Sequence, residues 1–177
     1  MRVFVAIDLS EEAKQGVLIA SSIIKDNAVS CSLSPKTNFH ITLAFLGEIE
    51  EERVSVIKEC LDDSFDKPFD ITIGGFGMFK RSFGDVVFRK VSFNKKNIAQ
   101  ILNFKKELSD KGFELDPNEF TAHVTISRKT VFVDDFSLDE QKLEPIPCHI
   151  DKITIFRSNM EANHKTWYSV IYQKELK

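Results

Sequence analysis

The chain has 177 residues, 42% of them hydrophobic and 29% charged, which is ordinary for one soluble globular domain or two small fused lobes. Its formal net charge of −3 excludes a general attraction to nucleic acid, so any such binding needs a local cationic patch. Three widely spaced cysteines argue against a disulfide framework or a CxxC metal site. With no signal peptide or membrane span, we expect a cytoplasmic protein that contacts no membrane.

The first half of the chain predicts strands that alternate with helices. In chain order these are a strand over Val3–Ile7, a helix from Ser10 to about Lys25, a strand over Phe39–Leu46, a helix from about Glu50 to Leu61 and a strand over Phe69–Ile73. Ser10 is a typical helix-capping residue and is followed by Glu11 and Glu12 in the first turn. A loop through Pro35 precedes the second strand, and the run Gly74–Gly77 is expected to end the third.

The second half predicts a similar succession. Its elements are a strand over Val86–Phe93, a helix from about Asn97 to Lys111, and strands over Ala122–Ser127, Ile150–Arg157 and Trp167–Gln173. Gly112 is suited to end the helix. Residues 131–143 show no clear period and predict a loop with a short helix.

The two halves repeat this order at a nearly constant offset. The offset is 83 residues from Val3 to Val86 and from His40 to His123, and 82 residues from Ile71 to Ile153. We therefore predict a single duplicated domain over 1–177, with halves of about 1–83 and 84–177. Strands and helices mix without a parallel-sheet pattern, which favours an α+β fold.

One tetrapeptide occurs in both halves. His40-Ile41-Thr42-Leu43 returns as His123-Val124-Thr125-Ile126. Residues i and i+2 of a strand share a face, so each histidine points the same way as its threonine while the apolar residues face a core. A pseudo-twofold arrangement would bring both pairs to one cleft. Two imidazoles there are a candidate general acid and general base.

The other two histidines have simpler explanations. His164-Lys165-Thr166 lacks the apolar middle residue and lies in a polar stretch, which predicts a turn outside the site. His149 lies between Pro147 and a strand, and we expect a structural role.

The motifs resemble those of the 2H phosphoesterase superfamily, and within it the RNA 2′,3′-cyclic phosphodiesterase branch, historically called 2′-5′ RNA ligase. The resemblance rests on the two H-x-T-x motifs, on the opening segment 2–8, on 40–47, on 75–79 and on 120–128. It departs where the family often has a Trp followed by Pro, since the corresponding positions here are Leu33 and Pro35, and where the family usually has Pro before the second histidine, at Ala122. These changes affect base stacking or loop shape rather than the catalytic groups.

The resemblance implies an α+β fold of two pseudo-twofold-related lobes, each an antiparallel sheet with helices outside, around a central cleft. It implies metal-independent hydrolysis of RNA 2′,3′-cyclic phosphate ends to 2′-phosphates, with a weak reverse 2′-5′ ligation and no cofactor. It implies that His40 is the acid and His123 the base; the residues alone do not order them. We expect a monomer that acts on RNA 3′ ends or small cyclic nucleotides.

Four other side chains are candidate substrate-binding residues. Thr42 and Thr125 can donate hydrogen bonds to phosphate oxygens from the faces of their histidines. Arg128, five residues after His123, can balance charge or hold RNA phosphate, although a solvated strand-end arginine is an equal alternative. Phe4 can line the cleft, with core packing as the stronger expectation.

Competing functions remain open from the residues. Two histidines without nearby Asp, Glu or Cys at ligand spacing argue against zinc, and no G-x-S-x-G elbow indicates a serine hydrolase. The closest alternative is a phosphodiesterase for ADP-ribose cyclic phosphate or another small cyclic nucleotide. An alternative from another class is a non-catalytic module that binds RNA ends.

Overall fold

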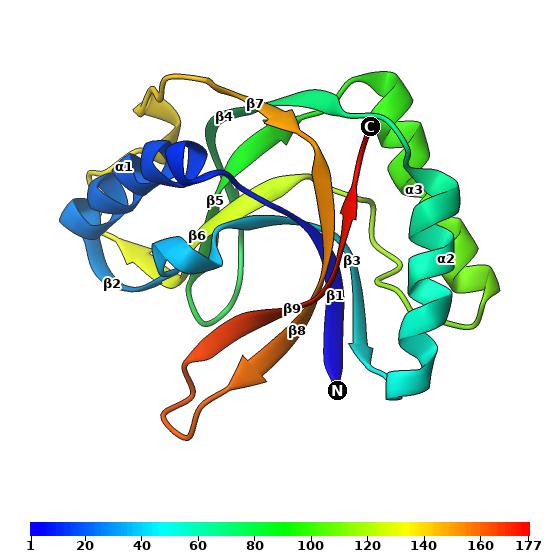
Figure 1. The fold of residues 1–177 in the computed structure, drawn as a ribbon. Helices are drawn as coiled ribbons and strands as arrows, with labels where there is room; N and C mark the ends of the chain where they lie inside the picture. The colour runs from blue at the N-terminus through cyan, green and yellow to red at the C-terminus, as the bar shows by residue number, and fades with distance from the viewer.

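The computed structural model describes residues 1–177 as two antiparallel sheets with helices on their outer sides (Figure 1). Sheet A contains, in spatial order, β3 (His40–Glu48), β1 (Arg2–Asp8), β8 (Lys152–Met160) and β9 (Thr166–Glu175). Sheet B contains β2 (Ala28–Leu33), β6 (His123–Phe132), β5 (Asp85–Ser92), β4 (Phe69–Phe79) and β7 (Ile146–Ile150). The predicted α+β class with two antiparallel lobes is confirmed.

The two sheets share one strand order although they are not the two halves of the sequence. The order β3-β1-β8 in sheet A corresponds to β6-β5-β4 in sheet B, and each sheet takes its third strand from the other half of the chain. The remaining strands β2, β7 and β9 extend the sheets at their edges. Each lobe is therefore built from both halves.

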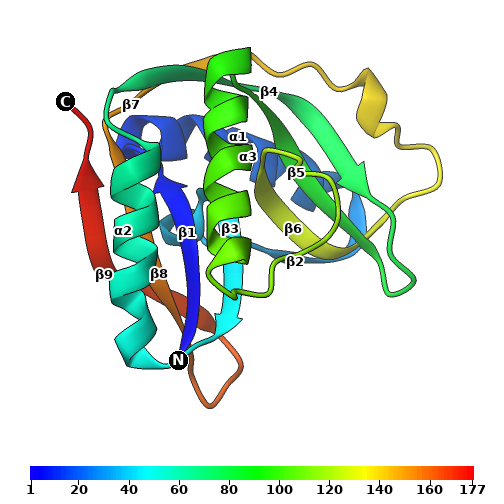
Figure 2. The same cartoon turned by 90° about the vertical axis from the view of Figure 1, so that its right-hand side faces the viewer.

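Three helices cover the outer faces of the sheets. Helix α1 (Glu11–Asn27) packs against β2 and β6 of sheet B, whereas α2 (Val54–Ser64) and α3 (Lys95–Asp110) lie side by side against sheet A (Figure 2). The side chain of Ser10 accepts a hydrogen bond from the amide of Ala13, which caps α1 as predicted. None of the helices has the length and apolar character that a membrane crossing requires.

The main hydrophobic core lies between the sheets and these helices. The second and fourth residues of each tetrapeptide are buried in this core: Ile41, Leu43, Val124 and Ile126. Phe4, Ala6 and Phe156 form a second, small apolar cluster with Tyr168 packed against it. The alternation of each motif strand thus directs its apolar residues into the core and leaves its histidine and threonine on the opposite face.

The structure differs from the sequence prediction mainly at the sheet edges. Strand β2 lies in a segment that was predicted as loop, since it carries small polar residues and leaves Val29 exposed rather than showing an apolar pattern. Strand β7 was not predicted as a separate strand, and it contains Pro147, which is tolerated at a sheet edge. Strand β4 continues through the glycine run to Phe79, because Gly77 pairs with Phe88 and leaves room for its ring. Helix α2 begins at Val54, after a 3-10 turn over Glu51–Arg53.

In the ambiguous segment 131–143, β6 extends to Phe132 and a 3-10 turn spans Leu138–Glu140. The other predicted strands and helices lie where they were expected, with ends shifted by a few residues.

Candidate active site

The two motif strands lie next to each other where the two sheets meet. Cα atoms of β3 approach those of β6 within 8 Å. Both strands border a cleft of about 1550 Å³. All six residues selected from the sequence line this cleft: Phe4, His40, Thr42, His123, Thr125 and Arg128.

Both histidines are held in the same way by the backbone. Nδ1 of His40 lies 2.7 Å from the carbonyl oxygen of Asn38, and Nδ1 of His123 lies 2.6 Å from that of Thr121. A carbonyl oxygen only accepts hydrogen bonds, so Nδ1 carries the proton in each neutral ring. Nε2 is then the unprotonated nitrogen of both histidines, available to accept a proton.

The two threonines differ in the substrate-free structure. Oγ1 of Thr42 lies 2.9 Å from Nε2 of His40, to which it donates when that imidazole is neutral. The Thr125 hydroxyl and Nε2 of His123 make no hydrogen bond within the chain. The first pair is therefore connected internally, whereas the second has free hydrogen-bonding groups.

Burial lowers the pKa of both histidines below the ordinary value. For each ring the hydrogen bond to the backbone carbonyl acts in the opposite direction, and the positive charge of Arg128 lowers the pKa further. His123, when protonated, also lowers the pKa of His40, which shows that the two imidazoles influence each other. Burial in the cleft and the charge of Arg128 thus both act against the charged form of each imidazole.

Aromatic rings on neighbouring strands support each imidazole. In sheet A, His40 packs against Phe4 with 5.0 Å between ring centroids and against the edge of Tyr168 at 5.2 Å. Phe4 is only 3% exposed, as expected for a core residue, but it also lines the cleft. Both roles considered from the sequence therefore apply to it. In sheet B, His123 packs against two phenylalanines, Phe88 at 5.1 Å and Phe79 at 5.3 Å.

Tyr168, Phe79 and Phe88 were not selected from the sequence. Phe88 lies directly opposite Thr125 across the β5–β6 ladder. Ala6 lies opposite Thr42 in the same way in the β1–β3 ladder, so the internal repeat could have identified this position once one of the two ladders was known. Tyr168 reaches the site through the pairing of β9 with β8 and of β8 with β1, and the sequence did not indicate which sheet these two strands join.

A β-bulge directs Arg128 into the cleft. Simple alternation from His123 and Thr125 would place Ser127 in the cleft and Arg128 in the core. The ladder with β5 instead pairs Phe88 with Thr125 but Val87 with Ser127, so β6 contains an extra residue before Ser127, and a second one follows before Thr130. Ser127 is buried and bonded to Thr130 at 2.7 Å, while the exposed Arg128 guanidinium makes no hydrogen bond or ion pair within the chain.

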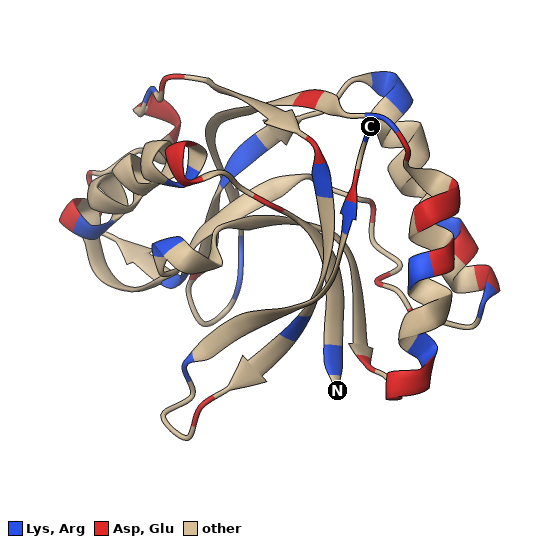
Figure 3. Ribbon diagram, in the orientation of Figure 1, with Lys and Arg blue, Asp and Glu red and all other residues tan.

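The cleft is locally cationic although the whole chain is acidic. Its lining includes five cationic side chains, Arg2, Arg128, Lys129, Arg157 and Lys165, and two carboxylates, Glu48 and Glu161. Figure 3 shows acidic and basic residues mixed along the outer helices on the right, with acidic residues on the turn before them. The local cationic patch that the net charge required for nucleic-acid binding is therefore present at the cleft.

Some of the remaining positions noted in the sequence line the cleft, and others lie outside it. Leu33 and Pro35, the positions matched to the family's Trp and the Pro that follows it, line the cleft. His164 lies in the predicted turn with a φ of 64°, but together with Thr166 it lines the cleft rim, which corrects the expectation that this copy lies outside the site. His149 lies outside the cleft, where its Nδ1 is 2.7 Å from a carboxylate oxygen of Asp70.

The donor set of the cleft is not that of a metal centre. No three His, Cys, Asp or Glu side chains of the chain are grouped closely enough to hold an ion. The arrangement instead offers two nitrogen bases, two hydroxyls and a free guanidinium around one space. Such a set can transfer protons and bind an anionic ester.

Comparison with protein families and curated sequences identifies relatives of this chain. The sequence profile of the family described as LigT like Phosphoesterase matches residues 7–86. The RNA 2′,3′-cyclic phosphodiesterase of Thermotoga maritima is 29% identical over 178 residues, which cover 98% of this chain and 94% of the relative. That of Methanocaldococcus jannaschii is 30% identical over 145 residues, covering 81% and 80%, respectively.

Solved structures share the fold at lower sequence identity. The protein TT0787 of Thermus thermophilus superimposes with a TM-score of 0.80 at 20% identity and covers 99% of this chain and 98% of that chain. Escherichia coli LigT in its apo form gives 0.80 at 19% identity, covering 99% and 96%. These structures share the two-sheet architecture along essentially the whole chain.

Proposed function

This chain belongs to the LigT-like phosphoesterase family, and we propose that it hydrolyses 2′,3′-cyclic phosphates at RNA 3′ ends to 2′-phosphomonoesters. The observation that carries the proposal is the pair of imidazoles, each with its Nδ1 proton donated to the backbone and with Nε2 left to exchange a proton. A cyclic phosphodiester needs one group to remove a proton and another to supply one. We expect a monomer, because one chain provides the whole cleft, and action in the cytoplasm.

The proton transfers divide between the two histidines. Nε2 of His123 removes a proton from water, whose oxygen forms a bond to phosphorus as the bond from phosphorus to O3′ breaks. Protonated His40 donates its Nε2 proton to the departing O3′, which leaves a free 3′-hydroxyl and a 2′-phosphate. The reaction ends with His123 protonated and His40 neutral, and exchange with solvent restores the starting forms.

The order of these roles follows the family resemblance, and the free structure is compatible with it. Nε2 of His123 has no partner in the chain and is open to a water molecule. Nε2 of His40 has the Thr42 hydroxyl as a neighbour, which accepts a hydrogen bond from the imidazolium when the ring is protonated. Each imidazole contributes roughly 10²–10⁴-fold to the rate in roles of this kind.

The charge that develops on phosphorus oxygens requires donors on the same face. Thr125 has a free hydroxyl, and Thr42 can turn its hydroxyl from His40 to a phosphate oxygen. The free guanidinium of Arg128 supplies positive charge and lines the same cleft as both histidines. Phe4 lines the cleft and packs against the His40 ring, and we assign it the support of that imidazole at the cleft wall.

We also propose that the same site joins RNA ends when another acceptor takes the place of water. If a 5′-hydroxyl replaces water as the attacking group, expulsion of O3′ produces a 2′-5′ linkage with the same two proton transfers. We expect this ligation to be weak, because water is present at a far higher concentration than any RNA 5′ end.

The test is hydrolysis of a 5′-labelled oligoribonucleotide with a terminal 2′,3′-cyclic phosphate, in the presence of EDTA. Wild type is expected to produce a 2′-phosphate end, and His40→Ala and His123→Ala are each expected to lower kcat/KM about 10³-fold. His149→Ala is the matched control, because this exposed histidine lies outside the cleft.

Circular dichroism of all variants would show that they remain folded. An inactive but folded wild type would contradict the proposal, as would variants of His40 and His123 that retain the activity of the His149→Ala control.

A further inference from the structure

We propose that Arg2 and Phe45 form a second subsite of the cleft, which binds the nucleotide that precedes the cyclic phosphate in an RNA chain. This inference rests on the proposed function and narrows it, since it makes the end of a chain, rather than a free cyclic mononucleotide, the preferred substrate.

The first observation is the orientation of Phe45. The ladder of β1 with β3 pairs Ala6 with Thr42 but Val5 with Ala44, so β3 contains an extra residue before Phe45. Ala44 is buried as a result, and the Phe45 ring lines the cleft with 42% of its surface exposed. A phenylalanine that could have been buried is thus directed outward beside the site, available for stacking.

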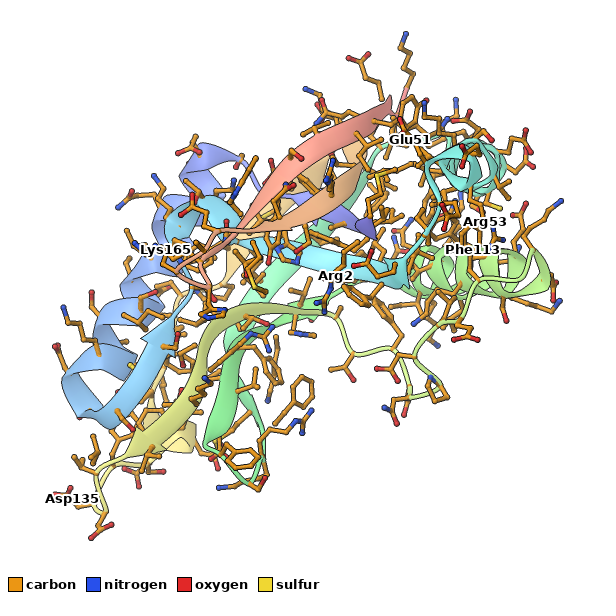
Figure 4. The ribbon with its side chains drawn as sticks, turned by 90° about the horizontal axis from the view of Figure 1, so that it is seen from below. Arg2, Glu51, Arg53, Phe113, Asp135 and Lys165 are labelled. Carbon is orange, nitrogen blue, oxygen red and sulfur yellow. The ribbon has the colours of Figure 1, made fainter.

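The second observation is the cation placed on this ring. The guanidinium carbon of Arg2 lies 5.0 Å from the centroid of Phe45. Arg2 makes no hydrogen bond or ion pair within the chain, so its five N–H groups are available to a ligand. Figure 4 shows Arg2 near the middle of the face seen from below, with Asp135 at a distant corner.

Tyr168 connects this subsite to the reacting centre. Arg2 lies opposite Ser158, and Ser158 lies opposite Tyr168, so the three residues form a row across sheet A. The Tyr168 ring packs against both Phe4 and His40, and its hydroxyl makes no hydrogen bond within the chain. Burial raises the pKa of Tyr168, while the charges of both Arg128 and Arg2 lower it. Tyr168 therefore packs on the imidazole of His40 and lies in the same row of sheet A as Arg2.

The distribution of charged side chains along the cleft indicates which part binds the preceding nucleotide. The lining segment from Ser32 to Asn38 contributes only uncharged side chains, which suit a sugar and a base. The sheet A side contributes Arg2, together with Arg157, and these suit the anionic phosphodiester that joins two nucleotides. Glu48 also lies there, but its carboxylate is 3.2 Å from the terminal ammonium of Met1.

An aromatic ring beside unpaired cations is the combination that binds single-stranded nucleic acid without reading its sequence. The volume of about 1550 Å³ also exceeds the roughly 300–1,000 Å³ of common small-ligand pockets, which leaves room for more than one nucleotide.

The experiment compares adenosine 2′,3′-cyclic phosphate with the dinucleotide ApA that ends in a 2′,3′-cyclic phosphate. For wild type, kcat/KM is expected to be at least about fivefold higher for the dinucleotide, the lower end of the effect of one stacked base. The double variant Arg2→Gln/Phe45→Leu is expected to bring this ratio close to one while its activity on the mononucleotide remains within about twofold of wild type.

The control is the double variant Lys67→Gln/Phe83→Leu. It removes an exposed lysine without an ion pair and a phenylalanine that is 88% exposed, and both residues lie outside the cleft. Its preference for the dinucleotide is expected to equal that of wild type. A wild-type ratio near one, or a ratio that survives in Arg2→Gln/Phe45→Leu, would overturn the subsite.

A binding measurement separates this inference from the proposed function. Dissociation constants are measured for the two products, adenosine 2′-phosphate and ApA 2′-phosphate. If neither cyclic substrate is hydrolysed, the proposed hydrolysis fails, but at least fivefold tighter binding of the dinucleotide that is lost in Arg2→Gln/Phe45→Leu still supports the subsite. Equal dissociation constants for the two products would reject it.

Discussion

The motif strands β3 and β6 have nearly the same backbone plan but differ five residues after the histidine. Each begins with a histidine and a threonine on the cleft face, and each then contains an extra residue that turns the fifth side chain into the cleft. That side chain is Phe45 in β3 and Arg128 in β6. The comparison teaches that the strand and its bulge determine where a side chain points, while the residue type determines whether that position suits a base or a phosphate.

The largest difference in kcat/KM between the two strands is expected when Phe45 of β3 and Arg128 of β6 are replaced. Arg128→Gln is expected to lower kcat/KM about 10–100-fold on mononucleotide and dinucleotide alike, because a hydrogen bond to a charged group contributes ~1.5–3 kcal/mol. Phe45→Leu is expected to affect only the dinucleotide.

Arg128→Gln is also expected to change the pH dependence. Since the guanidinium lowers the pKa of both histidines, its removal lets both pKa values rise, and the kcat/KM profile moves to higher pH. Lys67→Gln is the control for the loss of a positive charge. If the pH profile of kcat/KM did not shift in Arg128→Gln, and if Arg128→Gln and Phe45→Leu lost equal kcat/KM on both substrates, then the assignment of phosphate binding to Arg128 and base binding to Phe45 would be contradicted.

The threonines provide a sharper test with a smaller effect. Thr42→Val and Thr125→Val each remove one hydroxyl that we assign to phosphate binding, and each is expected to lower kcat/KM about fivefold, as for a net hydrogen bond of ~1 kcal/mol. Only Thr42 contacts its histidine in the free protein.

Nitrogen NMR of the substrate-free protein distinguishes these variants. The Nε2 signal of His40 is expected to shift in Thr42→Val, while that of His123 stays unchanged in Thr125→Val. Equal shifts in both variants would mean that the two pairs are connected alike in solution.

The smallest expected effect concerns the aromatic support of His123. A Cβ atom added at Gly77 would lie 2.6 Å from Cζ of Phe88, whereas one added at Gly75 would meet nothing within 4 Å. Gly77→Ala is expected to displace the Phe88 ring that packs on His123, to lower kcat severalfold and to destabilise the fold by about 1–3 kcal/mol.

Gly75→Ala is the matched control, with activity unchanged and a stability change within about ±0.5 kcal/mol. Thermal unfolding and kinetics of both variants provide the measurement. A Gly77→Ala protein that behaves like Gly75→Ala would show that Phe88 does not hold the imidazole.

Local patterns predicted the strands that carry the chemistry. Alternation was sufficient for β3 and β6, because each must bury one face, and it placed His40, Thr42, His123 and Thr125 on the other. The same rule fails at Arg128 and Phe45, since a bulge depends on the register between two strands and leaves no mark in the sequence of one.

Edge strands and distant partners were the other limit. Strand β2 makes only one ladder, with β6, and its residues are partly or fully exposed, so its sequence lacks the apolar pattern of a central strand. Tyr168 was located on a predicted strand, but its contact with His40 depends on which sheet that strand joins. Tertiary pairing, rather than local propensity, supplied this part of the site.

The exchange of β4 and β8 between the sheets also constrains how the protein can move. The chain passes from one sheet to the other after β1, after β2, after β3 and again after β7. Domain closure requires a hinge, a few residues that absorb the rotation of one body against another. Here several connections between the two sheets would have to bend together, so a single hinge is not enough for the two walls of the cleft to close on each other. We therefore expect the cleft to be preformed, with substrate entry and product release that need no rotation of one sheet against the other.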